Sequence, residues 1–225
     1  MRYSNTMIEV DTAKGLQDIS LETRLLMRRR IFLTGEIDME MANDFVQQMM
    51  YLDREGEEIR IYLNSCGGEV DAGLVIYDMM QAAESSISVC CVGHAYSMAA
   101  ILLAAAPKGQ RLILPHSKVM IHEPLIAGGI GGSASSIKKV SDSIMETRKL
   151  TVELLMKHTG QKKEDLEQAL SFDNYMNAEE AIAFGLCDRI INVPERMREE
   201  RESRVDPWYA VSLWSDIGLP NAVNG

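Results

Sequence analysis

The chain has 225 residues and a formal net charge of −10 at pH 7, counted with its histidines neutral. This is the length of one ordinary domain with room for an appendage, and it is long enough to bury a sizeable core. The excess of negative charge argues against binding to nucleic acid or to an anionic membrane surface.

The first elements are an arm and a helix. Residues 1–15 are polar and lack periodicity, which predicts an N-terminal arm rather than a core element. Residues 16–27 then carry apolar side chains at helical spacing (Leu16, Ile19 and Leu25), which predicts a helix.

Strands and helices alternate through the next part of the chain. Strands are predicted at residues 31–33, 59–64, 87–92, 111–114 and 118–121. Helices are predicted between them at residues 38–52, 70–80 and 97–106. This alternation predicts a parallel sheet with right-handed crossovers, and therefore an α/β domain.

The pattern changes after Pro124. A glycine-rich strip (128–132) leads to a long helix from Ser133 to about His158, with a narrow apolar stripe. Such a stripe suits packing against one partner surface, and the alternative is a helix that lies along its own sheet. Further elements are predicted at residues 163–170 (helix), 177–185 (helix) and 187–191 (strand), before a charged and then aromatic tail.

The cysteines and the N-terminal sequence indicate the cellular compartment of the protein. Four cysteines have neither metal-ligand nor disulfide-framework spacing, and two are adjacent in an apolar strand: Cys66, Cys90, Cys91 and Cys187. The N-terminus has no apolar signal core, and no apolar run approaches membrane-spanning length. We therefore expect a soluble cytoplasmic protein with reduced thiols and no membrane contact.

Two side chains lie at positions that are typical of catalytic or ligand-binding residues. Ser97 lies at a strand-to-helix turn, where unpaired helix N–H groups can hold the oxyanion that a serine nucleophile generates. The alternative is an ordinary helix cap. His122 follows a strand end, where α/β sheets place their ligands, and the alternative is a structural histidine. No metal-ligand cluster and no phosphate-binding loop is recognisable, so we expect no metal, no cofactor and no ATP hydrolysis by this chain.

Four sequence motifs then occur in a characteristic order and at characteristic intervals. They are N-S-C-G-G-E-V-D-A-G-L-V-I-Y-D (64–78), G-H-A-Y-S-M-A-A (93–100), K-G-Q-R-L-I-L-P-H-S-K-V-M-I-H-E-P (108–124) and F-D-N-Y-M-N-A-E-E-A-I-A-F-G-L-C-D (172–188). Together they resemble the ClpP family, the proteolytic subunit of the ATP-dependent Clp protease, over about residues 8–193. The resemblance implies the ClpP/crotonase fold, in which repeated β-α units form a head and about residues 125–158 form a protruding strand-helix handle. It divides the chain into an arm (1–15), a protease domain (16–193) and a tail (194–225).

The resemblance also implies a function and an assembly. A member of this family is a serine endopeptidase subunit of a ring-shaped, compartmentalised protease in protein quality control. It self-associates into two stacked seven-membered rings, a tetradecamer. A separate AAA+ unfoldase feeds it peptides and unfolded proteins and hydrolyses the ATP.

Position by position, the resemblance assigns site residues. Ser97 corresponds to the nucleophile, His122 to the general base and Asp173 to the orienting carboxylate. The backbone N–H groups of Gly68 and Met98 correspond to the oxyanion hole, and glycine at position 68 keeps a side chain out of the path of the substrate backbone.

The substrate and partner surfaces follow in the same way. Gly67 lies on one wall of the implied substrate groove, and Leu125 and Ile126 are candidates for the other wall. Tyr62 and Leu112 fall in the hydrophobic dock for the unfoldase, which is altered here because Arg60, Ala82 and Leu112 stand where aromatic residues are common.

Several positions depart from the family pattern. Tyr96 and Ala99 replace smaller residues beside the serine, and we expect Tyr96 to narrow the pocket for the P1 side chain. Cys66 replaces a proline, and Ser171-Phe172 replaces an Asp-Arg pair that bridges the rings. These departures predict a divergent paralogue. They support one alternative, a weakly active or inactive structural subunit of a ring mixed with a paralogue. A remote alternative is a crotonase-type acyl-CoA enzyme, which holds an enolate with paired N–H groups.

Overall fold

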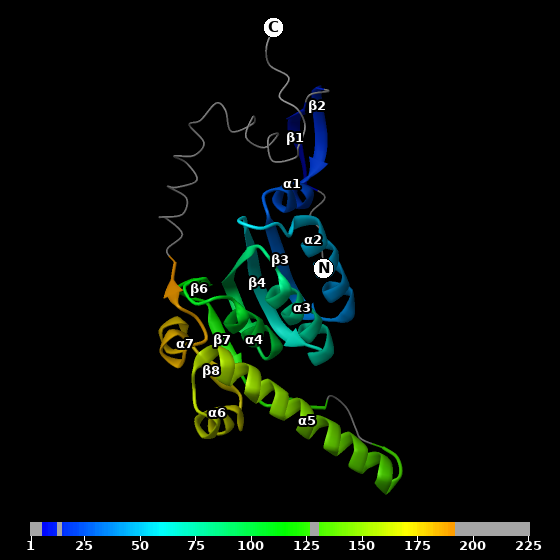
Figure 1. The fold of residues 1–225 in the computed structure, drawn as a ribbon, viewed down its shortest axis with the longest axis vertical. Helices are drawn as coiled ribbons and strands as arrows, with labels where there is room; N and C mark the ends of the chain where they lie inside the picture. Colours follow the sequence, from blue (N-terminus) through cyan, green and yellow to red (C-terminus); the bar gives the residue numbers. More distant parts are fainter. Residues whose placement is uncertain (1–5, 13–14, 127–130, 192–225) are drawn as a thin grey trace. The chain divides into compact units, whose positions relative to one another are not determined.

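The computed structural model describes residues 6–12, 15–126 and 131–191 (Figure 1). The chain forms two compact units. The larger contains residues 25–190, and the described part of the smaller consists of residues 6–12 and 15–24 together with Ile191.

The smaller unit contains a β-hairpin. β1 (Met7–Thr12) and β2 (Gly15–Ser20) pair antiparallel, with Ile8 opposite Ile19. Residues 7–12, for which the sequence pattern predicted no strand, therefore form one. The missed signal is the alternation of Ile8 and Val10 with acidic residues, which is typical of a strand.

The first helix is shorter than predicted. α1 spans Leu21–Met27 and follows Ser20, whose hydroxyl accepts a hydrogen bond from the Thr23 N–H at 3.0 Å. A serine in this position caps a helix. The predicted helical start at Leu16 was wrong because the backbone of residues 15–20 pairs with β1 instead.

The larger unit is built on a mostly parallel sheet, as predicted. In the described residues its strands are β3 (Arg30–Ile37), β4 (Glu58–Gly68), β5 (Ser86–Tyr96), β6 (Arg111–Ile113), β7 (Lys118–Ile121), β8 (Asn174–Met176) and β9 (Arg189–Ile190). The parallel order is β3-β4-β5-β6-β9. β7 pairs parallel with β5, and β8 pairs antiparallel with β7. The unit is therefore an α/β domain, and β8 is its one antiparallel strand in the described chain.

β5 changes its neighbour at Gly93. Before this glycine the strand pairs with β6, and after it with β7. A Cβ atom at position 93 would lie 2.4 Å from the Asn64 side-chain oxygen, so no other residue fits without displacing that side chain. The second half of β5 thus runs on between β4 and β7 and ends at Tyr96.

Helices lie around the sheet in the larger unit (Figure 1). They are α2 (Met39–Leu52), α3 (Val70–Ala82), α4 (Met98–Ala105), α5 (Ala134–Thr159), α6 (Lys163–Leu170) and α7 (Ala178–Phe184). Every residue of α4 is buried, which explains its uniformly apolar sequence. A Cβ atom at Gly73 of α3 would lie 2.2 Å from the Met98 side chain, so glycine lets α3 pack closely on α4. None of the helices in the described ranges is long and apolar enough to cross a membrane.

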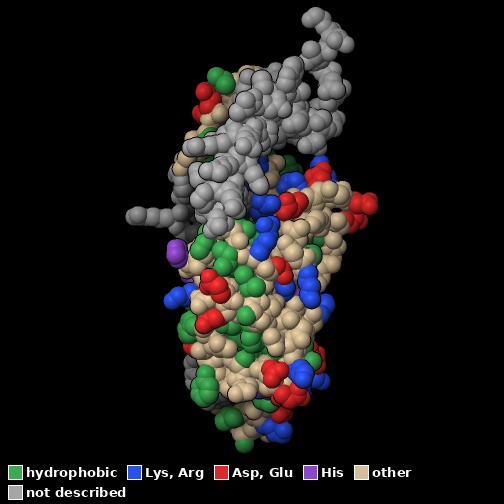
Figure 2. All heavy atoms as spheres, turned by 90° about the vertical axis from the view of Figure 1, so that its left-hand side faces the viewer, with side chains coloured by type: hydrophobic (Ala, Val, Ile, Leu, Met, Phe, Trp, Pro, Cys, Tyr) green, Lys and Arg blue, Asp and Glu red, His purple; other side chains and the backbone are tan. Residues whose placement is uncertain are grey.

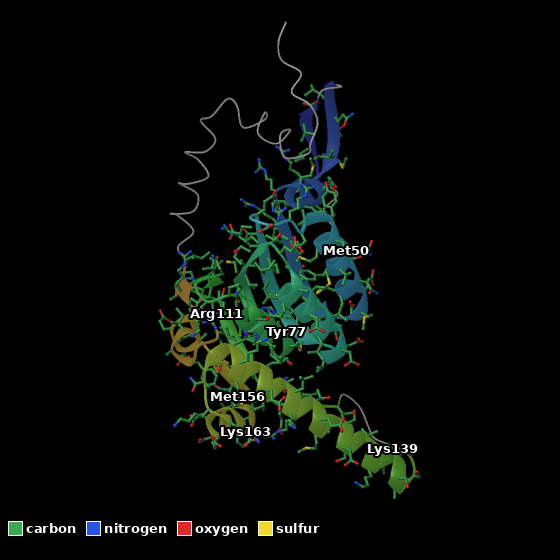
Figure 3. All side chains as sticks on the ribbon, viewed as in Figure 1. Met50, Tyr77, Arg111, Lys139, Met156 and Lys163 are labelled. Atoms are coloured by element: carbon green, nitrogen blue, oxygen red, sulfur yellow. The ribbon has the colours of Figure 1, made fainter. Side chains whose placement is uncertain are left out.

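α5 confirms the long helix predicted from Ser133 to about His158. Its C-terminal part is buried through Thr151, Val152 and Leu155, whereas Ile137 and Val140 near its start are exposed. Figure 3 shows Lys139 near the projecting end and Met156 near the body of the domain. The second half of the helix therefore packs on its own domain, and the packing of the first half against a partner surface stays a prediction.

The side of the domain that carries α6 and α7 has a mixed surface. Below the grey atoms of Figure 2, green apolar side chains gather among red and blue charged ones. Phe172, in the connection between α6 and β8, is 82% exposed. A large apolar side chain so open to solvent is a candidate for contact with another molecule.

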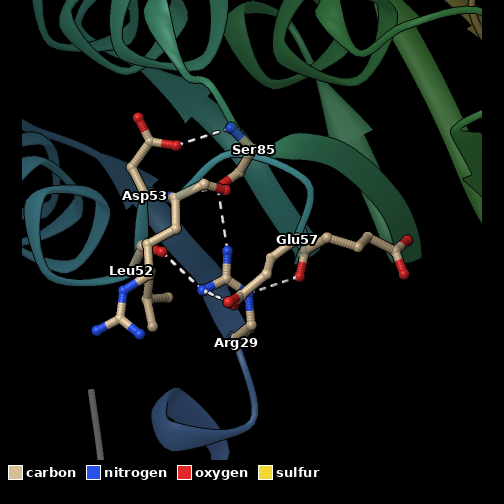
Figure 4. Close-up of polar contacts among 7 residues, drawn as sticks. Arg29, Leu52, Asp53, Glu57 and Ser85 are labelled. Carbon is tan, nitrogen blue, oxygen red and sulfur yellow. Dashed lines mark hydrogen bonds and ion pairs between the residues drawn. The ribbon is translucent and has the colours of Figure 1, made fainter. Parts of the chain in front are cut away.

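Ion pairs and hydrogen bonds connect residues at the edge of the sheet where its strands begin, which we call the amino edge. Arg29 precedes β3 and donates to the Leu52 carbonyl (2.6 Å) and the Ser85 hydroxyl (3.0 Å), and it pairs with Glu57 at 2.7 Å (Figure 4). Burial alone would raise the pKa of Asp53, but hydrogen bonds from the Ser85 N–H and hydroxyl hold this pKa below its usual value. The starts of β3, β4 and β5 are thereby tied together.

A second ionic cluster closes the same edge at β6 and β9. The Arg111 guanidinium pairs with both carboxylate oxygens of Asp188 and donates to the carbonyls of His158 (3.0 Å) and Gly185 (2.7 Å). Burial alone would raise the pKa of Asp188, but hydrogen bonds from Arg111 and its charge hold this pKa below the usual value. Each guanidinium nitrogen of Arg111 and each carboxylate oxygen of Asp188 therefore has a hydrogen-bond partner.

Next to this pair lies a hydrogen-bonded group from α3 and α5. The Tyr77 hydroxyl is 2.9 Å from His158 Nε2 and 3.0 Å from Lys157 Nζ. Burial, together with the positive charges of Lys157 and Arg111, lowers the pKa of His158 to about 4. Figure 3 shows Tyr77 and Arg111 within the body of the domain.

Candidate functional site

Three adjacent strands bring three distant side chains to the opposite edge of the sheet. Ser97 follows β5, His122 follows β7, and Asp173 precedes β8. Because β8 runs antiparallel to β7, its beginning lies beside the end of β7, and Ile121 is opposite Asn174. The next position in this register puts Asp173 beside His122.

These three side chains form a chain of hydrogen bonds. Ser97 Oγ lies 2.8 Å from His122 Nε2, and His122 Nδ1 lies 3.2 Å from Asp173 Oδ1. The imidazole is largely buried, whereas 57% of the Asp173 side chain is exposed. The structure thus joins the hydroxyl, the imidazole and the carboxylate that the sequence singled out.

The backbone of Ser97 has an unusual conformation. Its φ is +54° and its ψ is −124°, a combination that is rare for residues other than glycine. Such strain costs about 1–3 kcal/mol and is found where function requires it. The Ser97 side chain does not cap α4 and bonds to His122 instead, so the alternative of an ordinary helix cap was wrong.

Two adjacent glycines end β4, and the first of them lies against this serine. A Cβ atom at Gly67 would be 2.7 Å from Ser97 Cβ and 3.2 Å from the Met98 nitrogen. A Cβ atom at Gly68 would instead meet the Ile37 carbonyl oxygen of β3 at 2.1 Å. The close approach of β3 therefore requires glycine at position 68, and the prediction that this glycine also leaves room for an incoming peptide stays a prediction.

The beginning of α4 adds hydrogen-bond donors to the site. Met98 is the first residue of the helix, and the first N–H groups of an α-helix have no partner within it. They also carry the positive end of the helix dipole, which favours negative charge nearby. A developing oxyanion beside Ser97 would be stabilised by this arrangement.

A pocket with mostly apolar walls opens beside Ser97 and His122. Its other walls come from α3, α4, α5 and the segment after β7, through Val70, Ile101, Pro124, Thr151 and Leu155. Thr151 and Leu155 were expected only in the apolar stripe of α5, so their place in the pocket wall was missed. Leu125 and Ile126, which follow Pro124, are both exposed.

Tyr96 does not narrow this pocket, contrary to the prediction. It is absent from the pocket lining, and its ring instead packs against His94 at 4.8 Å and Tyr175 at 5.4 Å between centroids. Side chains alternate along β5, and Ala95 is the one buried in the core cluster. Tyr96 is therefore turned to the other face of the sheet.

The two residues expected in the partner dock lie in one row across the sheet. Tyr62 is aligned with Cys90, and Cys90 with Leu112. Leu112 is buried, and Tyr62 stacks on Phe32 with ring centroids 4.9 Å apart. Phe32 is exposed, and its place in this row depends on the pairing of β3 with β4.

The cysteines are all free thiols, and three of them are buried. Burial raises the pKa of Cys90 to about 12 and that of Cys91 to about 11, so these thiols are protonated at neutral pH. Cys66 is exposed and directly precedes Gly67. Within the described ranges no three histidine, cysteine, aspartate or glutamate side chains gather as metal ligands would.

Comparison with known protein families shows similarity to one described as Clp protease. The Clp protease family model matches residues 13–194, which is most of the chain. The matched range contains Ser97, His122 and Asp173, together with Gly67 and Gly68.

Proposed function

The chain belongs to the Clp protease family, and we propose that it is a serine endopeptidase that cleaves peptides and unfolded proteins. The observation that carries this proposal is the hydrogen-bonded series from Ser97 Oγ through the His122 ring to Asp173. Family membership supports peptidase activity, and this geometry supports the serine mechanism.

In the first half of the reaction, Ser97 attacks the peptide carbonyl carbon. His122 Nε2 takes the Ser97 proton as the new C–O bond forms, and Asp173 holds the imidazole and stabilises its positive charge. The carbonyl oxygen becomes an oxyanion, which accepts hydrogen bonds from the backbone N–H groups of Gly68 and Met98. His122 then gives the proton to the leaving amine as the C–N bond breaks.

The second half returns the enzyme to its starting state. Water attacks the acyl-enzyme, His122 takes a proton from that water, and the proton passes to Ser97 Oγ as the ester bond breaks. The product carboxylic acid then leaves. No cofactor or metal takes part in these steps.

The pocket beside Ser97 is proposed to receive the P1 side chain. Its apolar walls, among them Val70 and Leu155, favour an apolar P1 residue of modest size. The peptide backbone would pair as an extended strand between the Gly67–Gly68 segment and the Leu125–Ile126 segment.

We also propose the assembly and partners of this family for the chain. This comprises the ClpP/crotonase fold, two stacked seven-membered rings and a separate AAA+ unfoldase in the cytoplasm, with Tyr62 and Leu112 in the unfoldase dock. The exposed apolar side chains on the first half of α5 support such self-association, because a handle without a partner would leave them in water.

A fluorophosphonate probe tests the catalytic proposal. We expect the purified protein to be labelled at Ser97, and His122→Ala to suppress labelling strongly. Ser97→Ala should abolish labelling and lower peptide hydrolysis by at least about 10⁴-fold. Light scattering, with and without any co-encoded paralogue, measures whether rings form.

One outcome would favour a different function. A protein that forms rings but is not labelled would be a structural subunit of a mixed ring. Phe172 supports testing this alternative, because it stands exposed where the family has a charged bridging residue between rings.

A further inference from the structure

Asp173 stands at the least supported point of the hydrogen-bonded series. It precedes β8, which has three residues and pairs only with β7 among the described strands. On its N-terminal side, the Glu123 N–H donates to the Leu170 carbonyl at 3.0 Å, which ties the end of α6 to the segment after β7. The C-terminal side must therefore be held by β8 itself.

β8 is anchored through both of its faces. Met176 is buried in the core cluster, while Tyr175 points to the opposite face, since side chains alternate along a strand. Met120 of β7 is aligned with Tyr175 on one side and with Tyr96 of β5 on the other. One row of three side chains thus crosses three strands next to the site.

The two tyrosines of this row meet over the strand between them. Their ring centroids are 5.4 Å apart and the planes are at 88°, which is the edge-to-face arrangement that aromatic rings favour. Met120 between them is buried, and the Tyr96 ring also packs on His94 at 4.8 Å. The contact therefore links β5 directly to β8.

This contact joins the backbones that carry the two ends of the series. Tyr96 directly precedes Ser97, and Tyr175 follows Asp173 by two residues. A shift of β8 away from β7 would lengthen the 3.2 Å contact between Asp173 and His122. We propose that Tyr96 and Tyr175 are positioning residues whose ring contact holds Asp173 beside His122. This inference rests on the proposed protease function.

The inference predicts different effects for phenylalanine and alanine substitutions of the two tyrosines. Only the rings take part in the contact, so Tyr96→Phe and Tyr175→Phe should behave like the wild type. Tyr175→Ala and Tyr96→Ala should each lower kcat and the rate of Ser97 labelling by about 3- to 10-fold, given the usual strength of an edge-to-face pair. KM should stay unchanged, because neither tyrosine lines the substrate pocket.

A double-mutant cycle tests whether the effect passes through Asp173. In an Asp173→Asn background, Tyr175→Ala should cause no further loss of activity, because the carboxylate that it positions is already gone. Tyr51→Ala is the matched control, since it removes the same side chain from an exposed position on α2. It should leave labelling unchanged.

Three results would overturn the inference. The first is equal labelling of the wild type and Tyr175→Ala. The second is an undiminished further loss of activity when Tyr175→Ala is added to Asp173→Asn. The third is a phenylalanine variant that is labelled more slowly than the wild type. Failure of the proposed function is a separate result, namely a wild type that is not labelled at all. In that case crystal structures decide the inference, because the Asp173–His122 distance should be longer in Tyr175→Ala and unchanged in Tyr175→Phe.

Discussion

The two edges of the parallel sheet are built in opposite ways. At the amino edge, Arg29 and Arg111 each bond to several groups, and the carboxylates near them are hydrogen-bonded. At the edge where β5 and β7 end, which we call the carboxyl edge, Ser97 has a strained backbone and Asp173 is more than half exposed. The first edge holds the strands together, and the second holds groups that can react.

This difference shows how one sheet serves stability and chemistry at once. Strain and partly satisfied polar groups lower stability, so they persist only where the rest of the fold compensates for them. The buried helix α4 connects the two edges, because it begins beside Ser97 and ends at Ala105, whose carbonyl accepts a hydrogen bond from Gln81 at 3.0 Å. Matched substitutions at the two edges should therefore affect activity and stability separately.

The largest effect is expected from removing one charge at the carboxyl edge. Asp173→Asn should lower kcat by about 10³- to 10⁴-fold, because the amide cannot stabilise the imidazolium and favours the wrong histidine tautomer. The midpoint of thermal unfolding should change little, since the side chain is exposed. Peptide hydrolysis and calorimetry on the same preparation measure both quantities.

The same substitution at the amino edge should do the reverse. Asp188→Asn leaves the buried Arg111 guanidinium without its ionic partner, which typically costs about 3–5 kcal/mol of unfolding free energy. The activity of the protein that remains folded should stay close to that of the wild type. A loss of activity per folded molecule in this variant would contradict the division between the edges.

Two glycines with similar backbones sharpen the comparison further. Gly67 at the carboxyl edge has φ +89°, and Gly56, just before β4, has φ +80°. Gly67→Ala should slow Ser97 labelling by about 100-fold, because the new Cβ would displace the serine and misplacement of about 1 Å has that effect. Gly56→Ala meets no atom within 4 Å and should cost only about 1 kcal/mol of stability, with labelling unchanged. Equal labelling of both variants would show that Gly67 does not hold the serine in place.

Much of the carboxyl edge could be anticipated from the sequence, but for different reasons at different residues. The alternating elements follow from local apolar patterns, and the bounds of α7 agree with prediction because Asn177 caps its start and Gly185 marks its end. Ser97, His122 and Asp173 were singled out as a set through the family motifs, since no local pattern joins residues so far apart. Their approach to one another depends on the pairing of β5, β7 and β8.

The features that could not be predicted depend on contacts between distant segments. β8 has three residues, too few for a periodic pattern, and it is a strand only because β7 lies beside it. The side to which Tyr96 turns depends on the register of β5 against β7. The family resemblance led to the prediction that Tyr96 narrows the pocket, but Tyr96 is not among the residues that line it.

The smallest expected effect concerns protonation at the amino edge. The pKa of His158 is lowered to about 4, whereas a histidine in the unfolded chain has its ordinary pKa near 6.5. As the pH falls from 6.5 towards 4, the unfolded chain takes up a proton that the folded chain does not, so stability falls over this range. From pH 7 to pH 5 the loss due to His158 should be about 1 kcal/mol, after allowance for its partial exposure to water.

His158→Gln isolates this contribution. Glutamine has no charge to gain, so the variant should lose less stability than the wild type between pH 7 and pH 5 in urea unfolding at one protein concentration. The lowered pKa values of Asp53 and Asp188 do not interfere, because an unfolded aspartate titrates near pH 3.8, below this range. An equal loss in variant and wild type would mean that water and protons reach His158 in the folded protein. Water would then reach the amino edge near Tyr77, Lys157 and Arg111. The contrast between a stabilising amino edge and a reactive carboxyl edge would depend on Arg29 and Asp53 alone.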